Sequence, residues 1–167
     1  MPNSLPPHRA TAPLAGPEDR LEMVRLAVRG RPGLSASAVE VRRGNTSYTI
    51  DTLRELRRTE PERPLRLLLG SDAALAIQSW HEAEALLEEA SFIIFSRPSV
   101  ALDTGQLEKL GFPLRRTQLI RFETPAISAR MVRERLAQGE PVAEFLPTEV
   151  AGYIRDHGLY RPESRMG

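Results

Sequence analysis

The sequence predicts an α/β domain of the Rossmann-like kind, in which flanking helices cover a parallel sheet. Short, mostly apolar runs at residues 65–69, 92–95 and 119–122 have the length and composition of buried strands. Between these runs, apolar residues return at helical spacing. Because strands that alternate with helices favour a parallel sheet, ligands are expected beyond the carboxyl ends of the strands.

Composition excludes several classes of protein. The chain has 167 residues, 41% of them hydrophobic and 27% charged, which fits one globular domain with a sizeable core. The net charge of +1 gives no overall field for binding nucleic acid or membranes. No apolar run is long enough to span a bilayer, and the chain does not open with a secretory leader. With no cysteine, disulfides are excluded, and we expect a cytoplasmic protein.

The first third of the chain predicts a loop, a helix and a strand. Residues 1–17 are rich in proline and predict an extended loop. Residues 18–29 predict a helix, because acidic side chains fill the first turn and apolar ones share a face. Residues 35–43 predict a strand, since apolar and charged side chains alternate over residues 39–43.

The stretch at residues 44–53 predicts a polar turn followed by the start of a helix. Thr49 or Ser47 is expected to cap this helix, and Asp51 in the first turn suits the helix dipole. A strand, a polar turn and a helix N-terminus in succession would direct free backbone N–H groups at an anion. The alternative is an ordinary capped helix after a turn.

The remainder alternates strands with helices. Gly70, Ser71 and Asp72 follow the strand at 65–69, and a helix is expected up to Glu89 after Trp80. Ser128 is expected to cap a helix that Gly139 ends. A last helix is expected from Pro147 to Gly158, after which Leu159 and Tyr160 turn back toward the core.

Two candidate sites follow from the residues alone. Arg130 and Arg133 stand one turn apart near the positive end of the helix capped by Ser128, so together they could hold a di- or triphosphate. The alternative is a capped helix with solvated arginines. Trp80 could stack on an aromatic ring or anchor the core. Asp72 could bind a sugar hydroxyl or a metal-bound water, or cap the helix after it.

No catalytic motif is evident. The three histidines have no metal-ligand spacing, so no metal site is predicted in the protein. The nucleophile elbow, the Walker loop and the G-x-G-x-x-G turn are also absent, which removes the usual support for a hydrolase, a kinase or a dehydrogenase.

Read in order, short segments along nearly the whole chain resemble the bacterial nicotinate-nucleotide adenylyltransferase family. The segments are Pro6-Pro-His-Arg, Arg20-Leu-Glu-Met, Glu40-Val-Arg-Arg-Gly, Ser47-Tyr-Thr-Ile-Asp-Thr-Leu, Gly70-Ser-Asp, Trp80, Ser96-Arg-Pro, Ile127-Ser-Ala-Arg-Met-Val-Arg, Leu146-Pro and Tyr153-Ile-Arg-Asp-His-Gly-Leu-Tyr.

The resemblance implies adenylyl transfer from ATP to nicotinate mononucleotide, which gives deamido-NAD and pyrophosphate in NAD biosynthesis, with Mg²⁺ accompanying ATP. It implies that the mononucleotide is bound by Thr49, Ile50, Trp80, His81 and Asp72. It implies that phosphates are bound by Arg9, Ser128, Arg130 and Arg133. No nucleic-acid or membrane partner is implied, and no oligomeric state is predicted.

The chain departs from the family pattern in two places. The G-x-F-D-P-x-H-x-G-H motif is absent, so no catalytic residue is identified. The usual Ser-x-Thr is Ser128-Ala129-Arg130. Since the family's strand order is 3-2-1-4-5, we expect a sheet without its first one or two strands, and an unpaired side at residues 39–43 and 65–69. We expect that the printed start is not the biological start or that the gene is a remnant, and that these residues alone do not catalyse.

The resemblance also implies domain limits. Residues 1–17 would be a remnant of the loop that binds substrate and ATP, residues 18–162 the nucleotidyltransferase domain, and residues 163–167 a tail. Three alternatives stay open: a non-catalytic or truncated relative that only binds a pyridine mononucleotide, an adenylyltransferase for another small substrate, and an arginine-rich nucleic-acid binder. The near-neutral charge counts against the last.

Overall fold

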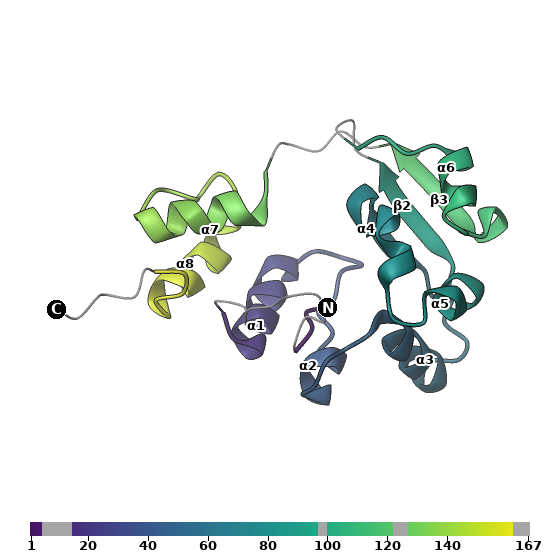
Figure 1. Ribbon diagram of the computed structural model, residues 1–167. Coiled ribbons are helices and arrows are strands. Elements are labelled where there is room, and N and C mark those ends of the chain that lie inside the picture. Colours follow the sequence, from purple (N-terminus) through teal and green to yellow (C-terminus); the bar gives the residue numbers. More distant parts are fainter. Residues whose placement is uncertain (5–14, 97–99, 122–126, 162–167) are drawn as a thin grey trace. The chain divides into compact units, whose positions relative to one another are not determined.

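The computed structural model describes residues 1–4, 15–96, 100–121 and 127–161, and the chain divides into two compact units (Figure 1). The sheet unit is Tyr48–Pro125, and the helical unit combines Met1–Ser47 with Ala126–Gly167. Within the described ranges, no helix has the length and apolar character needed to cross a membrane. The predicted domain limits at 18–162 and 163–167 stay predictions, and the tail lies outside the described residues.

Three parallel strands form the sheet in the described part of the sheet unit. They are β1 (Leu67–Gly70), β2 (Phe92–Ser96) and β3 (Thr117–Arg121), in the order β1-β2-β3. Ile94 on the central strand lies opposite Leu69 on one side and Leu119 on the other. The predicted α/β class with a parallel sheet is therefore confirmed.

Helices surround this sheet (Figure 1). Their bounds are α3 (Thr49–Thr59), α4 (Ser71–Leu75), η1 (Ile77–Ser79), α5 (Ala83–Glu89), α6 (Thr104–Lys109) and η2 (Leu114–Arg116). The core of the unit joins Ile50 of α3, Ile77 of η1 and Leu86 of α5 to the strand residues Phe92 and Ile94, all of them almost fully buried. Burial of this apolar surface is the main stabilising term for the unit.

Ion pairs set α3 against α5. Arg54 reaches Glu89 at 2.8 Å and Glu82 at 2.9 Å, and Arg57 reaches Glu89 at 3.2 Å. All four side chains are partly exposed, so each pair contributes little to stability. Their geometric effect is larger, because they tie both ends of α5, at Glu82 and Glu89, to α3.

The helical unit contains α1 (Pro17–Val28), α2 (Val39–Arg43), α7 (Ala129–Gln138) and α8 (Thr148–Asp156). The predicted helices at 18–29, at 128–138 and after Pro147 are confirmed. The hydroxyl of Tyr153 on α8 donates to Asp19 of α1 at 3.0 Å. Arg20 of α1 donates to the carbonyl of Ser4 at 2.8 Å and to that of Ala15 at 3.2 Å.

The prediction of a strand at residues 35–43 is wrong, because residues 39–43 form the five-residue helix α2 and residues 35–38 form no strand. A stretch this short fits a period of two and a helical period equally well. Glu40 in the first turn and Arg42 and Arg43 in the last turn suit the helix dipole. Gly44 ends the helix with φ 75°, a left-handed conformation that glycine adopts without strain.

The strand predicted at 65–69 is confirmed as β1, and it lies at an edge of the described sheet. It pairs with β2, and no other described strand pairs with it. Leu68 on this strand is 59% exposed. The unpaired strand edge expected at residues 65–69 is therefore observed among the described residues. At residues 39–43 no strand forms, so the expected unpaired edge there does not exist.

Candidate functional site

The start of α4 is anchored at the carboxyl end of the sheet. The hydroxyl of Ser71 donates to the carbonyl of Phe95, the residue opposite Gly70 on β2, at 3.1 Å. Asp72 follows on the exposed side of this turn. Gly70 is the N-cap of α4 and no side chain caps the helix, so the alternative in which Asp72 is a capping residue is wrong. Its carboxylate lies where ligands of parallel sheets usually bind.

No side chain caps the N-terminus of α3. The N-cap residue is Tyr48, in an extended conformation, and no side-chain hydrogen bond caps the helix. The prediction that Thr49 or Ser47 caps it is therefore wrong. The hydroxyl of Ser47 is buried and has no hydrogen-bond partner among the described residues. Because the first N–H groups of a helix have no intrahelical acceptor, those at Thr49 and Ile50 can serve an external anion.

Two segments expected to bind the mononucleotide are held together by an aromatic stack. The rings of Tyr48 and His81 lie with their centroids 4.1 Å apart and their planes inclined by 28°. Tyr48 immediately precedes α3, and His81 immediately follows Trp80. The stack therefore brings the open helix start and the segment after η1 into one place in the sheet unit.

Trp80 is partly buried and packs against the hydrophobic core. The backbone N–H group of Trp80 donates to the carbonyl of Ile77 at 3.0 Å. Two residues later, Glu82 adopts φ 49°, a left-handed conformation that is uncommon for a residue with a side chain, and Arg54 holds its carboxylate. Part of the Trp80 ring packs against the core and part stays accessible, so its position is compatible with both predicted roles, core anchor and stacking platform.

In the helical unit, α7 begins as predicted. Ser128 is the N-cap, and its hydroxyl accepts from the N–H group of Met131 at 3.1 Å. The two arginines of this helix differ in their surroundings. Arg130 is 84% exposed and already paired with Glu134 at 2.8 Å. Arg133 is half-buried, and no described residue forms an ion pair or hydrogen bond with it.

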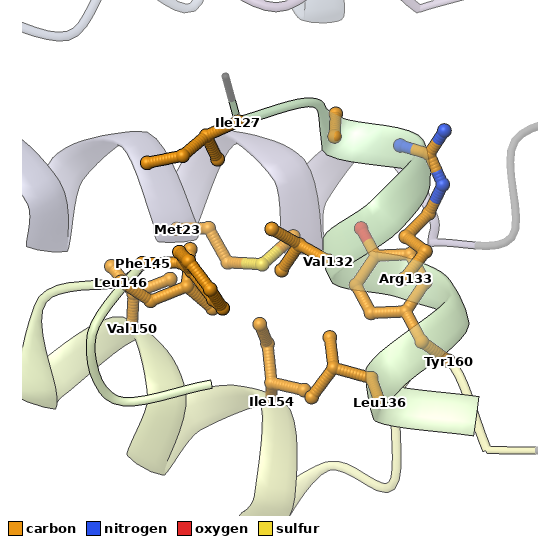
Figure 2. Close-up of a pocket in the computed structure, with 11 residues that line it drawn as sticks. Met23, Ile127, Val132, Arg133, Leu136, Phe145, Leu146, Val150, Ile154 and Tyr160 are labelled. Atoms are coloured by element: carbon orange, nitrogen blue, oxygen red, sulfur yellow. The ribbon is translucent and has the colours of Figure 1, made fainter. Parts of the chain in front are cut away.

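Arg133 lies at the rim of an apolar cavity of about 280 Å³ (Figure 2). Apolar side chains from α1, the residue before the N-cap of α7, α7 itself, α8 and the α7–α8 connection line most of it: Met23, Ile127, Ala129, Val132, Leu136, Phe145, Leu146, Val150 and Ile154. Tyr160 lies beside Arg133 and completes the lining. The predicted return of Tyr160 toward the core is confirmed, but sequence reasoning assigned it no part in a site.

The remaining predicted site residue, Arg9, lies outside the described residues, and so does His8, one of the three histidines. His157 stacks on Tyr153, with ring centroids 3.9 Å apart. Within the described ranges, no three residues among histidine, cysteine, aspartate and glutamate are grouped so that they could hold a metal ion.

We expect Ser128→Ala to lower the free energy of unfolding of the helical unit by about 1 kcal/mol, the usual value of an N-cap hydrogen bond. Urea denaturation followed by circular dichroism measures this change. Ser128→Asp is the matched control, because its carboxylate can still accept from the N–H group of Met131. An alanine variant as stable as the parent chain would show that the cap contributes nothing here.

Comparisons with known proteins agree on one family. The sequence profile described as Cytidylyltransferase-like matches residues 1–135. A protein of Aeromonas hydrophila named "Probable nicotinate-nucleotide adenylyltransferase" is 38% identical, covering 97% of this chain and 82% of that protein. A protein of the same name from Halalkalibacterium halodurans is 34% identical, covering 99% of this chain and 77% of that protein.

A solved structure supports the fold. The structure titled "Plasmodium falciparum nicotinic acid mononucleotide adenylyltransferase complexed with NaAD" superposes with a TM-score of 0.67. The superposition covers 91% of this chain and 78% of the Plasmodium falciparum chain, and the two sequences are 21% identical. At this level of identity the likeness establishes the shared fold.

Proposed function

The chain belongs to the nicotinate-nucleotide adenylyltransferase family, and on that basis we propose that it transfers the adenylyl group of ATP to nicotinate mononucleotide. The products are deamido-NAD and pyrophosphate, which makes it an enzyme of NAD biosynthesis. The predicted cytoplasmic location remains a prediction.

The stack of Tyr48 on His81 is the observation that carries the proposal for the mononucleotide. It draws together the backbone at Thr49 and Ile50 and the backbone at Trp80 and His81, two segments that the family resemblance assigns to the mononucleotide, and in this proposal their amides hold the nicotinate carboxylate. The uncapped start of α3 adds the positive end of an 11-residue helix. Backbone amides arranged in this way bind an anion without a mobile counter-charge.

Trp80 and Asp72 complete the mononucleotide site in this proposal. The accessible part of the indole ring would stack on the pyridine ring, while its buried part keeps the indole in one orientation. The exposed carboxylate of Asp72, at the carboxyl end of the sheet, would accept hydrogen bonds from ribose hydroxyls.

The phosphates of ATP are assigned to the start of α7. Arg133 is the better-placed cation, because it has no described partner, whereas Arg130 must first leave Glu134. Ser128 and the first N–H groups of the ten-residue helix add hydrogen bonds and the positive end of the dipole. Arg9 keeps the phosphate role that the family resemblance implies.

The reaction needs alignment and charge neutralisation more than a protein nucleophile. An oxygen of the mononucleotide phosphate attacks the α-phosphorus of ATP, the bond to the bridging oxygen breaks, and pyrophosphate leaves. No described group of residues fits a resident metal ion, so we assign Mg²⁺ to the MgATP substrate and derive no step through it. We name no catalytic residue.

Binding and turnover test this proposal separately. Trp80 is the only tryptophan of the chain, so its fluorescence reports directly on the proposed ring site. We expect nicotinate mononucleotide to quench it, and nicotinamide mononucleotide, which lacks the carboxylate, to quench it only at higher concentration. Product formation is measured by chromatographic detection of deamido-NAD with ATP and Mg²⁺ present.

Each result has a distinct meaning. Formation of deamido-NAD supports the proposed reaction and contradicts the expectation that these residues alone do not catalyse. Binding of both substrates without product is the result which that expectation predicts, and it also fits the non-catalytic relative that the sequence leaves open. Absence of binding by either substrate contradicts the proposal, and retention on DNA would favour the nucleic-acid binder.

A further inference from the structure

Arg133 and Tyr160 share one rim of the apolar cavity in the helical unit (Figure 2). Figure 2 shows the aliphatic stem of Arg133 lying beside the ring of Tyr160, with the guanidinium directed away from the apolar lining. Side chains on a helix incline toward its N-terminus, so this guanidinium is directed toward the start of α7. The ring and the stem together close one side of the cavity.

Two neighbouring charged side chains of the helical unit form hydrogen bonds with groups other than Arg133. Arg20 donates to two backbone carbonyls and to the side chain of Asn3 at 3.0 Å, and Asp19 accepts from Tyr153. Arg133 has no such partner among the described residues. An arginine side chain has several freely rotating bonds, so without a partner its direction must come from packing.

The backbone at Tyr160 is itself constrained. The turn after α8 is closed by hydrogen bonds from Gly158 to Arg155 and from Leu159 to Ile154, at 3.2 and 3.0 Å. Tyr160 then adopts φ 62°, a left-handed conformation that is costly for a bulky side chain. Such a conformation persists only where surrounding contacts hold it, and here it directs the ring into the cavity rim beside Arg133.

The phenol leaves the charge of Arg133 unneutralised. Burial raises the pKa of Tyr160 above its ordinary value, and the guanidinium groups of Arg133 and Arg20 offset this rise only in part. The phenol is therefore uncharged at neutral pH. Arg133 keeps its full positive charge for an anion at the start of α7.

We propose that Tyr160 is a positioning residue, whose ring holds the stem of Arg133 so that the guanidinium meets the phosphates of ATP at the start of α7. This inference rests on the proposed role of Arg133 in ATP binding. The aromatic ring does the positioning, and the hydroxyl is dispensable. Packing of this kind lowers the entropy lost when the guanidinium engages a phosphate, since its direction is already set.

The variants Tyr160→Phe and Tyr160→Leu separate the ring from the hydroxyl. We expect Tyr160→Leu to raise the Kd of ATP about fivefold, within the range of coupling between side chains in contact. Tyr160→Phe should bind ATP as the parent chain does, which is rescue by the conservative variant. The Kd of nicotinate mononucleotide should stay unchanged in both, and calorimetry measures each value.

A double-mutant cycle with Arg133→Ala provides the decisive measurement. If Tyr160 acts through Arg133, then Tyr160→Leu should have no further effect on ATP binding once Arg133 is alanine. Leu146→Ala is the matched control, because it removes a cavity-lining side chain that does not flank Arg133. It should leave the Kd of ATP unchanged, and circular dichroism should show that all variants remain folded.

The outcomes also distinguish this inference from the proposed function. If Arg133→Ala does not weaken ATP binding, the proposed role of Arg133 fails, and this inference fails with it. If Arg133→Ala weakens ATP binding but Tyr160→Leu does not, this inference alone is overturned. The same holds if Tyr160→Leu weakens ATP binding equally in the parent chain and in the Arg133→Ala variant. An equal loss in Leu146→Ala would also overturn it, because general loosening of the cavity would then explain the result.

Discussion

Replacement of Arg133 by alanine is expected to weaken ATP binding about 10- to 150-fold, the equivalent of losing charge-assisted hydrogen bonds worth about 1.5–3 kcal/mol. The reason is that no described carboxylate competes for this guanidinium, so its whole charge serves the ligand. Arg133→Lys should also lose affinity, because a forked contact with phosphate becomes a point charge. Isothermal calorimetry with ATP, with and without Mg²⁺, measures both variants.

Arg135→Ala is the matched control on the same helix. Arg135 contacts Glu144 at 3.3 Å and Glu140 at 3.6 Å, and its guanidinium lies 5.1 Å from the centre of the Phe145 ring. Since these partners already use its charge, its loss should change the Kd of ATP less than twofold. An equal loss of affinity in the Arg133 and Arg135 variants would mean that α7 attracts ATP only through its overall charge.

Replacement of Trp80 by alanine is expected to weaken the binding of nicotinate mononucleotide by about 1–3 kcal/mol, the scale of stacking between a base and an aromatic side chain. This corresponds to about 5- to 150-fold in Kd. The ring also packs against the core, so truncation will cost some stability as well. Trp80→Leu restores apolar volume without an aromatic face, and it should therefore show the same loss of affinity in a more stable protein.

The affinity for ATP separates the two roles of Trp80. Stacking on the pyridine ring predicts that ATP binding stays nearly unchanged in both variants. If ATP and the mononucleotide weaken together, and Trp80→Leu recovers both, the residue is a core anchor and nothing more. Calorimetry replaces fluorescence in this experiment, because either substitution removes the only tryptophan.

The strands of the sheet could be predicted because their signal is local and strong. The segment 92–95 is apolar on both faces, which few arrangements other than a covered parallel strand can bury. The segment 65–69 is apolar except for Arg66, although Leu68 proves to be 59% exposed at the sheet edge. The role of Ser128 as an N-cap could be predicted for the same reason, because its side chain accepts a hydrogen bond from a residue only three positions later. The segment at 39–43 was misread because five residues carry too little periodicity to separate a strand from a helix.

Free backbone N–H groups at the start of α3 were expected, but the lack of a side-chain cap was not, because hydroxyls at Ser47 and Thr49 satisfy the local rule for a cap. The structure places the N-cap at Tyr48 instead, and the ring of that residue stacks on His81, 33 positions later in the chain. A contact between residues so distant in sequence overrides the local preference.

The sequence by itself determined the α/β class and the family, and the family resemblance proposes a set of residues for each substrate. The tertiary structure decided which of these side chains are free to act. Arg130 and Arg133 are equivalent in sequence, yet Glu134 pairs with one, while the other lies beside Tyr160 at a cavity rim. The helical repeat sets which side of α7 each residue occupies, but the packing of α1, α8 and the final turn determines what covers that side. Burial and charge pairing arise from these long-range contacts, which no single segment encodes.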